Sequence, residues 1–506
     1  MNLHENEIAS VFRPSDKIKV LTALAPTLVF CILVFGYFVT YGSYQFLVEE
    51  DFGNFFDYQA MSMLEGRFDV PDFAIRGEAF VIDGRLYGYF GITPSLLRIP
   101  FILFDLAAGR MSRSLMVVYF VITLLCAFQI LRLSIKTATD PKAEPPAWAI
   151  AVFILAVGLG STILFLGSRS FTYHEAILCG IAFSASSSMF AMQWVAQPSK
   201  RWWIGAVFCA ALTVHARPSV GLFSVTFVSA VAAWLWLKPW SGKLLSGRLP
   251  GLSAAEPRQT LVSIVVIVLS GIALLSFNAI GYLKFGTFEG APLRYHVQVA
   301  SNPERLANVA DGNFYLANIP VNVDAYVTGR HFKIDSHFPY FFASELPEDD
   351  GRVDANRIDH SEPTVAIPYS MPALFVISVL GGICALVFVP QLRGLLIITW
   401  LSVLPMASAL FAAVDISHRY TGDFVPFLVI TSAIGLAALM SSIGRARALL
   451  ILGVTTLVCL SIVISVALTM EYQDTIWGVD SSVKERYSVL KRSVDEFIGN
   501  SDQNGF

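Results

Sequence analysis

Carboxylates gather in the polar stretch that follows the first long apolar run of the chain. Glu49, Glu50, Asp51 and Asp57 lie directly beyond that run, and Glu78 lies further along the same stretch. Where such an apolar run ends at a membrane surface, the acids that follow it can point into a cavity at that surface. A carboxylate so placed can act as a general base, which takes the proton from an attacking hydroxyl group.

Three arginines stand in short polar segments between later apolar runs. Arg169 lies in GSRSFTYHE, Arg217 in TVHARPS and Arg419 in DISHRYTGDF. An arginine held at a membrane surface needs a partner. That partner is either a nearby carboxylate, such as Glu175 or Asp423, or an anionic group on a ligand. The planar guanidinium suits phosphate, and phosphate at that depth belongs to a lipid headgroup or a polyprenyl phosphate.

A carboxylate base combined with cations suits sugar transfer from a lipid-phosphate donor. The base removes the proton of the acceptor hydroxyl, and the cations offset the charge that builds on the departing phosphate. These residue types are suggestive of that chemistry without being specific to it. The elements that carry them decide whether they meet on one side of the membrane.

Long apolar runs set the fold class. Of the 506 residues, 55% are hydrophobic and 14% charged, and the mean hydropathy is +0.62. About twenty apolar residues span a bilayer as a helix, so we expect an all-α polytopic membrane protein of about eleven transmembrane helices, with interfacial helices. The net charge of −3 gives no sign of nucleic-acid binding. The predicted spans are 20–41, 112–134, 147–166, 174–196, 202–216, 218–237, 260–282, 371–390, 394–413, 421–441 and 447–469.

The placement of lysine and arginine orients the chain. The stretch 93–109 is apolar but short and contains two prolines, so we expect it to lie at the interface without crossing the bilayer. With that choice most basic residues of the connecting loops fall on the cytoplasmic side. The expected segments are a cytoplasmic N-terminus at 1–19, a membrane module at 20–282 whose external loop 42–111 carries the catalytic acid, a second extracytoplasmic loop at 283–370, membrane helices at 371–469, and an amphipathic extracytoplasmic tail at 470–506.

The external segments carry local signals of structure. Residues 54–64 read as a short interfacial helix that contains Asp57, and the alternating pattern around Asp83 and Gly84 predicts a β-hairpin. The loop 283–370 contains the aromatic stretches FYLANIP and HFPYFFASELP. These aromatic residues either stack on sugar rings as an acceptor platform or lid, or pack on the membrane surface.

Cofactors and disulfides are not indicated. All six cysteines fall within apolar runs without metal-ligand spacing, so we expect them to be packing residues. No acidic metal cage is evident; the chemistry admits a divalent metal, but the sequence does not indicate one. The chain also contains no Asn-x-Ser/Thr sequon, which favours the cytoplasmic (inner) membrane of a bacterium over a eukaryotic secretory membrane.

Several motifs follow one another along the chain in a recognisable order. They are the acidic cluster with an aromatic segment ending in MLEGRFDVP, the proline-containing TPSLLRIPF, the arginine-proline step ARPS, and the pair NAIGYLKFGTF and HRYTGDFVPFL. In this order, from residue 20 to about 440, the chain resembles the GT-C superfamily of membrane glycosyltransferases. That superfamily includes the aminoarabinose transferases and the protein O-mannosyltransferases.

The resemblance implies an activity and a set of site residues. The expected reaction moves a sugar from a polyprenyl-phosphate-linked donor to a lipid, glycan or protein acceptor, with inversion of the anomeric centre and a base in the first external loop. We favour Asp57 as that base, then Asp51, then Glu78. The expected donor phosphate-binding residues are Arg98, which stands where the family often has lysine or histidine, and Arg169, His174, His215, Arg217, His418 and Arg419. The expected substrate contacts are Tyr58, Tyr173, Tyr420 and Asp423.

Two other functions stay open at this point. A transporter or flippase of lipid-linked sugars would place charges near the bilayer midplane on broken helices in matching halves, whereas here the polar residues lie at one surface. A polymerase or ligase that moves a whole lipid-linked glycan would have its site on the same face, and the sequence does not separate it from a transferase of single sugars. A structural or signalling role explains neither the acid-rich loop nor the outer arginines.

Overall fold

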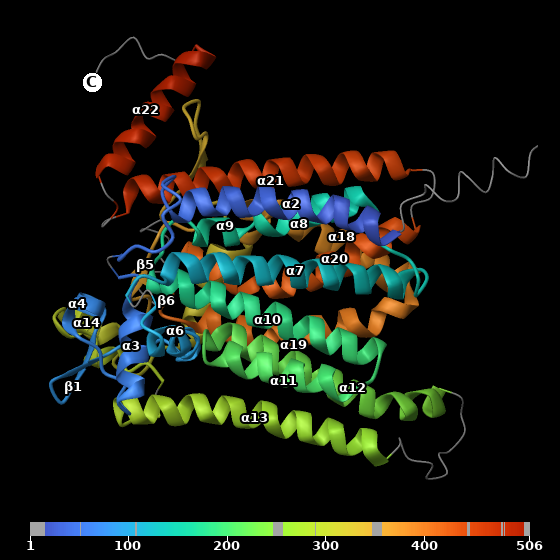
Figure 1. Ribbon diagram of the computed structural model, residues 1–506, viewed down its shortest axis with the longest axis horizontal. Helices are drawn as coiled ribbons and strands as arrows, with labels where there is room; N and C mark the ends of the chain where they lie inside the picture. Colours follow the sequence, from blue (N-terminus) through green and yellow to red (C-terminus); the bar gives the residue numbers. More distant parts are fainter. Residues whose placement is uncertain are drawn as a thin grey trace, which may run out of the picture.

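The computed structural model is a bundle of long helices with short elements gathered at one end (Figure 1). It describes residues 16–50, 52–106, 109–245, 257–288, 290–346, 357–442, 446–476, 479 and 481–499. Within these ranges, eight helical stretches are long and apolar enough to cross a membrane. The helices of these stretches are α2 (Asp16–Val39), α7 (Ser112–Ala138), α10 (Thr172–Ala196), α12 (Pro218–Leu245), α13 (Pro257–Phe285), α19 (Pro390–Ala412), α20 (Val425–Ser442) and α21 (Arg447–Thr475).

The three other predicted spans are also helical but shorter. They contain α8 (Ala147–Gly158) with α9 (Thr162–Leu166), α11 (Lys200–Val214) and α18 (Pro372–Phe388). Between α8 and α9 the chain breaks, and the Ser161 side chain caps α9 by accepting from the amide of Ile163. At about 1.5 Å per residue, a 15-residue helix such as α11 is shorter than the roughly 30 Å hydrocarbon core. Every predicted span is thus mainly helical, the span 147–166 as two helices, and eight meet the length of a crossing.

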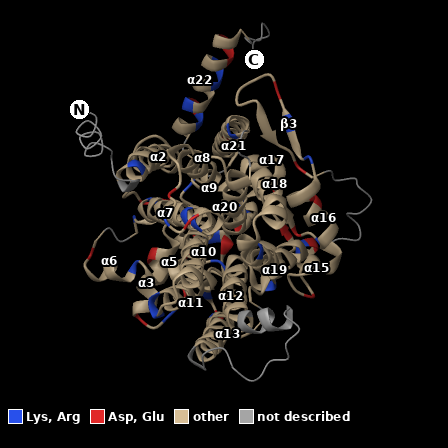
Figure 2. Ribbon diagram, turned by 90° about the vertical axis from the view of Figure 1, so that its right-hand side faces the viewer, with Lys and Arg blue, Asp and Glu red and all other residues tan. Residues whose placement is uncertain are grey.

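The bundle has a buried centre and a lipid-facing rim. In the most apolar stretch of each helix, 83% of residues are buried for α10 and 78% for the stretch that includes α20, against 17% for α2, 22% for α13 and 28% for α21. Figure 2 shows the same arrangement, with α10 and α20 inside and α2, α13 and α21 towards the outside. The rim exposes apolar side chains such as Leu21 and Leu275, as expected where lipid is the solvent.

The described part of residues 42–111, which we call the first external segment after its expected place outside the membrane, folds over the end of the bundle (Figure 1). The helix predicted at 54–64 is confirmed as α3, and the hairpin predicted at Asp83 and Gly84 is confirmed, since both residues have positive φ between paired strands. The apolar stretch at 93–109 contains two helices of only four and five residues, too short to cross. The elements of this segment are α3 (Phe55–Leu64), α4 (Asp72–Ile75), η1 (Arg76–Glu78), β1 (Phe80–Ile82), β2 (Arg85–Tyr87), α5 (Thr93–Leu96) and α6 (Ile99–Leu103).

The described part of residues 283–370, which we call the second external segment in the same sense, lies at the same end of the bundle (Figure 1). Its last strand, β5, pairs in parallel with β6 (Asp415–Ile416), which leads into η6 (His418–Phe424) and α20. The elements of this segment are η2 (Leu293–Tyr295), α14 (Val297–Ala300), α15 (Pro303–Asn308), η3 (Leu316–Asn318), α16 (Ile319–Val323), η4 (Asp324–Thr328), β3 (Phe332–Ile334), β4 (Phe341–Ala343), β5 (His360–Ser361) and α17 (Ile367–Ser370).

The C-terminal tail contains the predicted amphipathic helix, α22 (Ser481–Ile498). Its polar side is anchored by Asp495, whose Oδ1 accepts from the amide of Phe338 at 2.8 Å. Tyr487 is buried, while Phe497 is exposed. The helix therefore packs partly on the second external segment.

Candidate active site

A cavity of about 670 Å³ lies at the end of the bundle that carries both external segments. Part of its wall is apolar and comes from the ends of three membrane helices. Leu222 belongs to α12, Leu274 and Phe277 to α13, and Ala409 and Leu410 to α19. The rest of the wall carries arginines, carboxylates and tyrosines. The cavity is therefore amphipathic, with aliphatic surface at the membrane helices and charged surface from the segments beyond them.

Arg419 of η6 is held at this wall by a carboxylate and two rings. Its Nη1 donates to both oxygens of Glu362 at 2.7 Å, and its guanidinium lies 4.9 Å from the ring centre of Tyr173 and 5.3 Å from that of Tyr420. Burial would raise the pKa of Glu362, but the charge of Arg419 and the hydrogen bonds to the carboxylate hold it well below its usual range. Glu362 therefore stays ionised and fixes the cation at the cavity.

Arg217 and Arg169 bring two further guanidinium groups to the same cavity. Arg217 donates through Nη2 and Nε to Asp423 at 3.2 and 3.3 Å and lies 4.8 Å from the ring centre of Tyr420. Arg169 lies over Phe171 at 4.5 Å. The cation–π contacts place the ring of Tyr420 against both Arg217 and Arg419. Arginines from three distant parts of the sequence thus share one wall.

Glu78, at the end of η1, lines the cavity as a bound carboxylate. It accepts from the hydroxyl of Tyr173, from Nε2 of Gln298 at 3.4 Å, and lies 3.4 Å from Nε2 of His296. Burial alone would raise the pKa of Glu78, but the hydrogen bonds from His296 and Tyr173 outweigh it and lower the pKa. Its oxygens are therefore largely occupied by protein donors.

Asp359 and Asp415 lie side by side on the cavity wall but differ in their partners. Asp359 accepts from Nη2 of Arg305 at 2.6 Å and from its Nε at 3.0 Å. Asp415 accepts no hydrogen bond from any residue in the described ranges. Burial, with the like charge of Asp359 next, raises the pKa of Asp415 to about 6. Of the two, Asp415 is the carboxylate with oxygens available to a bound molecule.

Backbone pairing between β5 and β6 brings these side chains together. The amide of Asp359 donates to the carbonyl of Val414 at 2.8 Å, and the amide of Glu362 donates to the carbonyl of Ile416 at 2.9 Å. The second external segment is thereby joined to the strand that precedes η6. This short ladder positions Asp415 and Glu362 in one rigid unit with Arg419.

Asp57, which the sequence favoured as the base, is not among the residues that line the cavity. It is fully buried and accepts from Nε of Arg98 at 2.8 Å and from the amide of Gly109 at 3.1 Å. Arg98 also donates to Glu175 at 2.9 Å and to the hydroxyl of Ser112 at 3.0 Å. We call Asp57, Arg98 and Glu175 the buried cluster. Since Arg98 is enclosed with two carboxylates, it has no access to a donor phosphate here, contrary to expectation.

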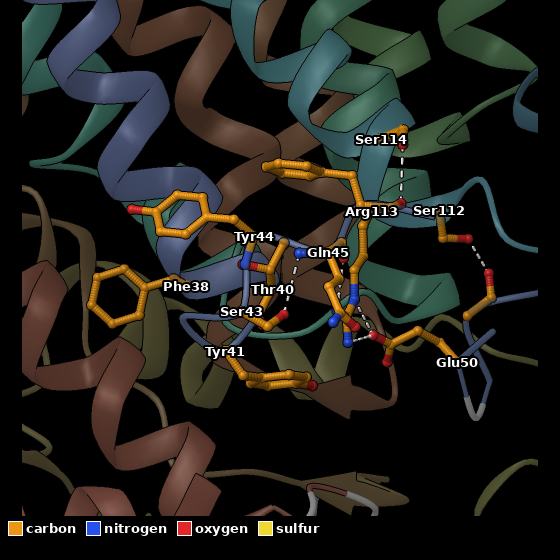
Figure 3. A network of polar contacts seen from close by, with 12 residues as sticks. Phe38, Thr40, Tyr41, Ser43, Tyr44, Gln45, Glu50, Ser112, Arg113 and Ser114 are labelled. Carbon is orange, nitrogen blue, oxygen red and sulfur yellow. Dashed lines mark hydrogen bonds and ion pairs between the residues drawn. The ribbon is translucent and has the colours of Figure 1, made fainter. Parts of the chain in front are cut away.

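Glu50, another acid of the first external segment, also has a protein partner. Glu50 forms an ion pair with Arg113 at the start of α7, and Arg113 in turn donates to the carbonyl of Gln45 at 2.9 Å (Figure 3). The Arg113 guanidinium lies over the ring of Tyr41 at 5.4 Å. This pair fastens the chain that leaves α2 onto α7. Asp51 lies outside the described residues.

The three expected histidines do not line the cavity, and neither does Tyr58. His174 Nδ1 lies 3.2 Å from the carbonyl of Leu166, and His418 accepts from the amide of Val365 at 3.4 Å. His215 Nε2 lies 2.8 Å from the hydroxyl of Ser276. The ring of Tyr58 packs edge-on against Phe73. These side chains hold helices and loops together, whereas the expected Tyr173 and Tyr420 do reach the cavity. Asp423 does not line the cavity, but it accepts hydrogen bonds from Arg217 and Ser219, which do.

Sequence reasoning missed several residues of the polar wall. The overlooked residues are His296, Arg305, Asp359, His360, Glu362, Asp415 and Tyr472. Two sequence signals were available: the acidic stretch ending in RIDHSEP, which contains Asp359, His360 and Glu362, and Asp415 itself in DISHRYTGDF. In the part of the chain that the structure describes, no group of three or more His, Cys, Asp or Glu side chains is arranged to hold a metal.

Comparisons with known proteins give distant structural matches. No protein-family model matches the chain, and no curated protein matches it. The chain is similar to the crystal structure of the oligosaccharyltransferase of Archaeoglobus fulgidus in the apo form, with a TM-score of 0.45 and 14% identity, over 94% of this chain and 60% of that one. It therefore spans less than two thirds of that protein.

A second match is ArnT from Cupriavidus metallidurans bound to undecaprenyl phosphate, with a TM-score of 0.42 and 10% identity, over 95% of this chain and 79% of that one. The archaeal enzyme AglB in complex with an inhibitory peptide and a dolichol-phosphate gives a TM-score of 0.44 at 14% identity, over 92% and 59%.

Proposed function

We propose that this chain is a membrane glycosyltransferase that moves a sugar from a polyprenyl-phosphate-linked donor to a lipid, glycan or protein acceptor. The single observation that supports it is the amphipathic cavity. Its apolar wall of α12, α13 and α19 matches an isoprenoid chain, and its arginines match a phosphate. Undecaprenyl phosphate and dolichol phosphate, which the two similar enzymes hold, belong to this class of lipid.

In the proposed reaction the three arginines of the wall, Arg169, Arg217 and Arg419, hold the donor phosphate. An acceptor hydroxyl attacks the anomeric carbon, a new C–O bond forms, and the bond from that carbon to the phosphate oxygen breaks. The electron pair leaves with polyprenyl phosphate, whose growing charge the guanidinium groups offset. A cavity carboxylate takes the acceptor proton. This single displacement inverts the anomeric centre.

We further propose that the cavity faces the non-cytoplasmic side of a bacterial inner membrane, with the N-terminus in the cytoplasm. The distribution of basic residues supports this orientation. Because the ionisable residues that line the cavity come from the two external segments and the helix ends next to them, the arrangement also favours chemistry at one surface over transport through the midplane.

The test uses the purified full-length protein with undecaprenyl-phosphate-linked glucose, mannose, galactose and N-acetylglucosamine, each radiolabelled, and a bacterial membrane extract as acceptor source. We expect one donor to lose its sugar to the extract, with release of an equal amount of undecaprenyl phosphate. Movement of intact donor between the leaflets of liposomes, without release of undecaprenyl phosphate, would instead support a flippase.

A further inference from the structure

Among the described residues, the cavity is lined by four carboxylates, and they are not equivalent. Asp359 is bound by Arg305, Glu362 by Arg419, and Glu78 by tyrosine and glutamine donors. Asp415 accepts from no residue in the described part of the chain. A general base must offer a free oxygen to the proton that it removes, and three of the four carboxylates already use theirs to position other side chains.

We propose that Asp415, and not a carboxylate of the first external segment, is the general base of the transfer reaction. This inference rests on the proposed function. Asp415 deprotonates the acceptor hydroxyl as that oxygen attacks the anomeric carbon, so the proton passes to the Asp415 carboxylate while the electron pair of the broken C–O bond leaves on polyprenyl phosphate. The proton returns to water after the products leave.

The backbone around Asp415 is built to hold such a group in place. The residues on either side, Val414 and Ile416, are 2% and 0% exposed, and both of their carbonyls accept backbone hydrogen bonds from the segment around β5. The next residue, Ser417, donates its amide to the hydroxyl of Tyr326 at 3.1 Å. A catalytic side chain on a fixed backbone keeps its distance to the substrate, which a general base requires.

Asp415 also lies beside the cations that would hold the donor. Asp415 begins β6, and Arg419 lies in η6, which follows β6 directly. The charge of Arg419 lowers the pKa of Asp415. The base and an arginine for the departing phosphate therefore belong to one unit, β6 with η6. A donor phosphate on Arg419 would set the anomeric carbon within the same part of the cavity as the Asp415 carboxylate.

The charged surroundings of Asp415 suit a base that works near neutral pH. Burial and the charge of Asp359 raise its pKa to about 6, while His360, Arg419 and Arg305 act in the opposite direction. The carboxylate is the active form of the base, so the rate is full above this pKa and falls as the pH drops through it. We expect about a tenfold loss per pH unit well below pH 6.

The experiment compares wild type, Asp415→Asn, Asp415→Glu and the control Asp324→Asn, a carboxylate of the second external segment that does not line the cavity. Two quantities are measured for each: transfer from the active donor, and the Kd for undecaprenyl phosphate alone. We expect Asp415→Asn to transfer at least 100-fold more slowly with a Kd within threefold of wild type. Asp415→Glu should recover part of the rate, and Asp324→Asn should match wild type.

The pH profile separates the base from its neighbour His360. In His360→Gln a group that lowers the pKa of Asp415 is lost, so the acidic limb should move to higher pH and persist. A limb that disappears in this variant would assign it to His360 and overturn the proposal. Asp415→Asn transferring within threefold of wild type would overturn it as well, while leaving the glycosyltransferase in place.

Two further outcomes are informative. If Asp415→Asn loses undecaprenyl phosphate binding together with transfer, Asp415 belongs to the donor site and is not the base. If wild type itself neither binds undecaprenyl phosphate nor transfers from any donor, the proposed function fails and the base assignment falls with it.

Discussion

Two groups of arginine and carboxylate side chains in this molecule contain the same chemical types in opposite settings. In the buried cluster, Arg98 stands between Asp57 and Glu175, and all three side chains are 0% exposed. At the cavity, Arg419 is 10% and Glu362 27% exposed, with Asp415 beside them. The buried cluster also uses helix ends, since Asp57 and Glu175 lie in the first turns of α3 and α10, where the helix dipole favours an anion.

Pairing of an arginine with a carboxylate therefore does not by itself mark a functional site. The buried cluster joins α3, the start of α6 and α10. Its ion pairs therefore hold the first external segment to the bundle. The cavity group has one pair, Glu362 with Arg419, and one carboxylate, Asp415, that accepts no hydrogen bond from the residues that the structure describes. A side chain can act on a substrate when its charge is not fully used by protein partners and when there is open space beside it for the substrate.

The largest expected effect comes from breaking the buried cluster. Arg98→Leu leaves two buried carboxylates without their cation, which costs about 3–5 kcal/mol of folding free energy. We expect the variant to accumulate poorly, with a strongly lowered thermal midpoint in detergent by fluorescence size-exclusion chromatography. The exposed ion-pairing arginine Arg67 is the control, and Arg67→Gln should leave the midpoint unchanged. A wild-type midpoint for Arg98→Leu would mean that the cluster does not hold the fold.

A smaller effect, measured as affinity for the donor lipid, is expected at the cavity. Arg419→Gln removes a charge-assisted hydrogen bond to phosphate, worth about 1.5–3 kcal/mol. We expect the Kd for undecaprenyl phosphate to rise about 10- to 100-fold, as measured by native mass spectrometry with graded lipid. The control is Arg330→Gln, an exposed arginine that does not line the cavity. Equal affinity in Arg419→Gln and wild type would remove Arg419 from the donor site.

The smallest expected effect on transfer belongs to Asp57→Asn. The amide keeps an oxygen that can accept from Arg98 but loses the negative charge of the carboxylate, so the variant should be less stable than wild type. Per folded molecule, its transfer rate should stay within about threefold of wild type. Activity is normalised to the monodisperse fraction. A loss of 100-fold or more, with Asp415→Asn fully active, would reverse the comparison and return the base to the first external segment.

Local patterns predicted local structure well. The interfacial helix α3, the hairpin at Asp83 and Gly84, and the amphipathic α22 each follow from residues adjacent in sequence. The cavity arginines and Glu78 were also among the expected residues, because charges at the ends of apolar runs must gather at one membrane surface.

The partners of those charges could not be predicted in the same way. Arg98 meets Asp57 across 41 residues and Glu175 across 77, and Arg419 meets Glu362 across 57. Whether a carboxylate is enclosed or open depends on these long-range contacts. Asp57 has a more suggestive neighbourhood in the sequence than Asp415, yet the packing of α3 on α6 encloses it.

The cavity wall draws on residues from Glu78 to Ile476, and this spread has a consequence for biogenesis. Tyr472 and Ile476 stand at the end of α21, the last of the long membrane helices described. During synthesis the wall stays incomplete until that helix has entered the bilayer. A nascent chain halted after α20 would therefore carry the arginines of the cavity without the complete cavity wall. We expect the protein to become active only after α21 has entered the membrane.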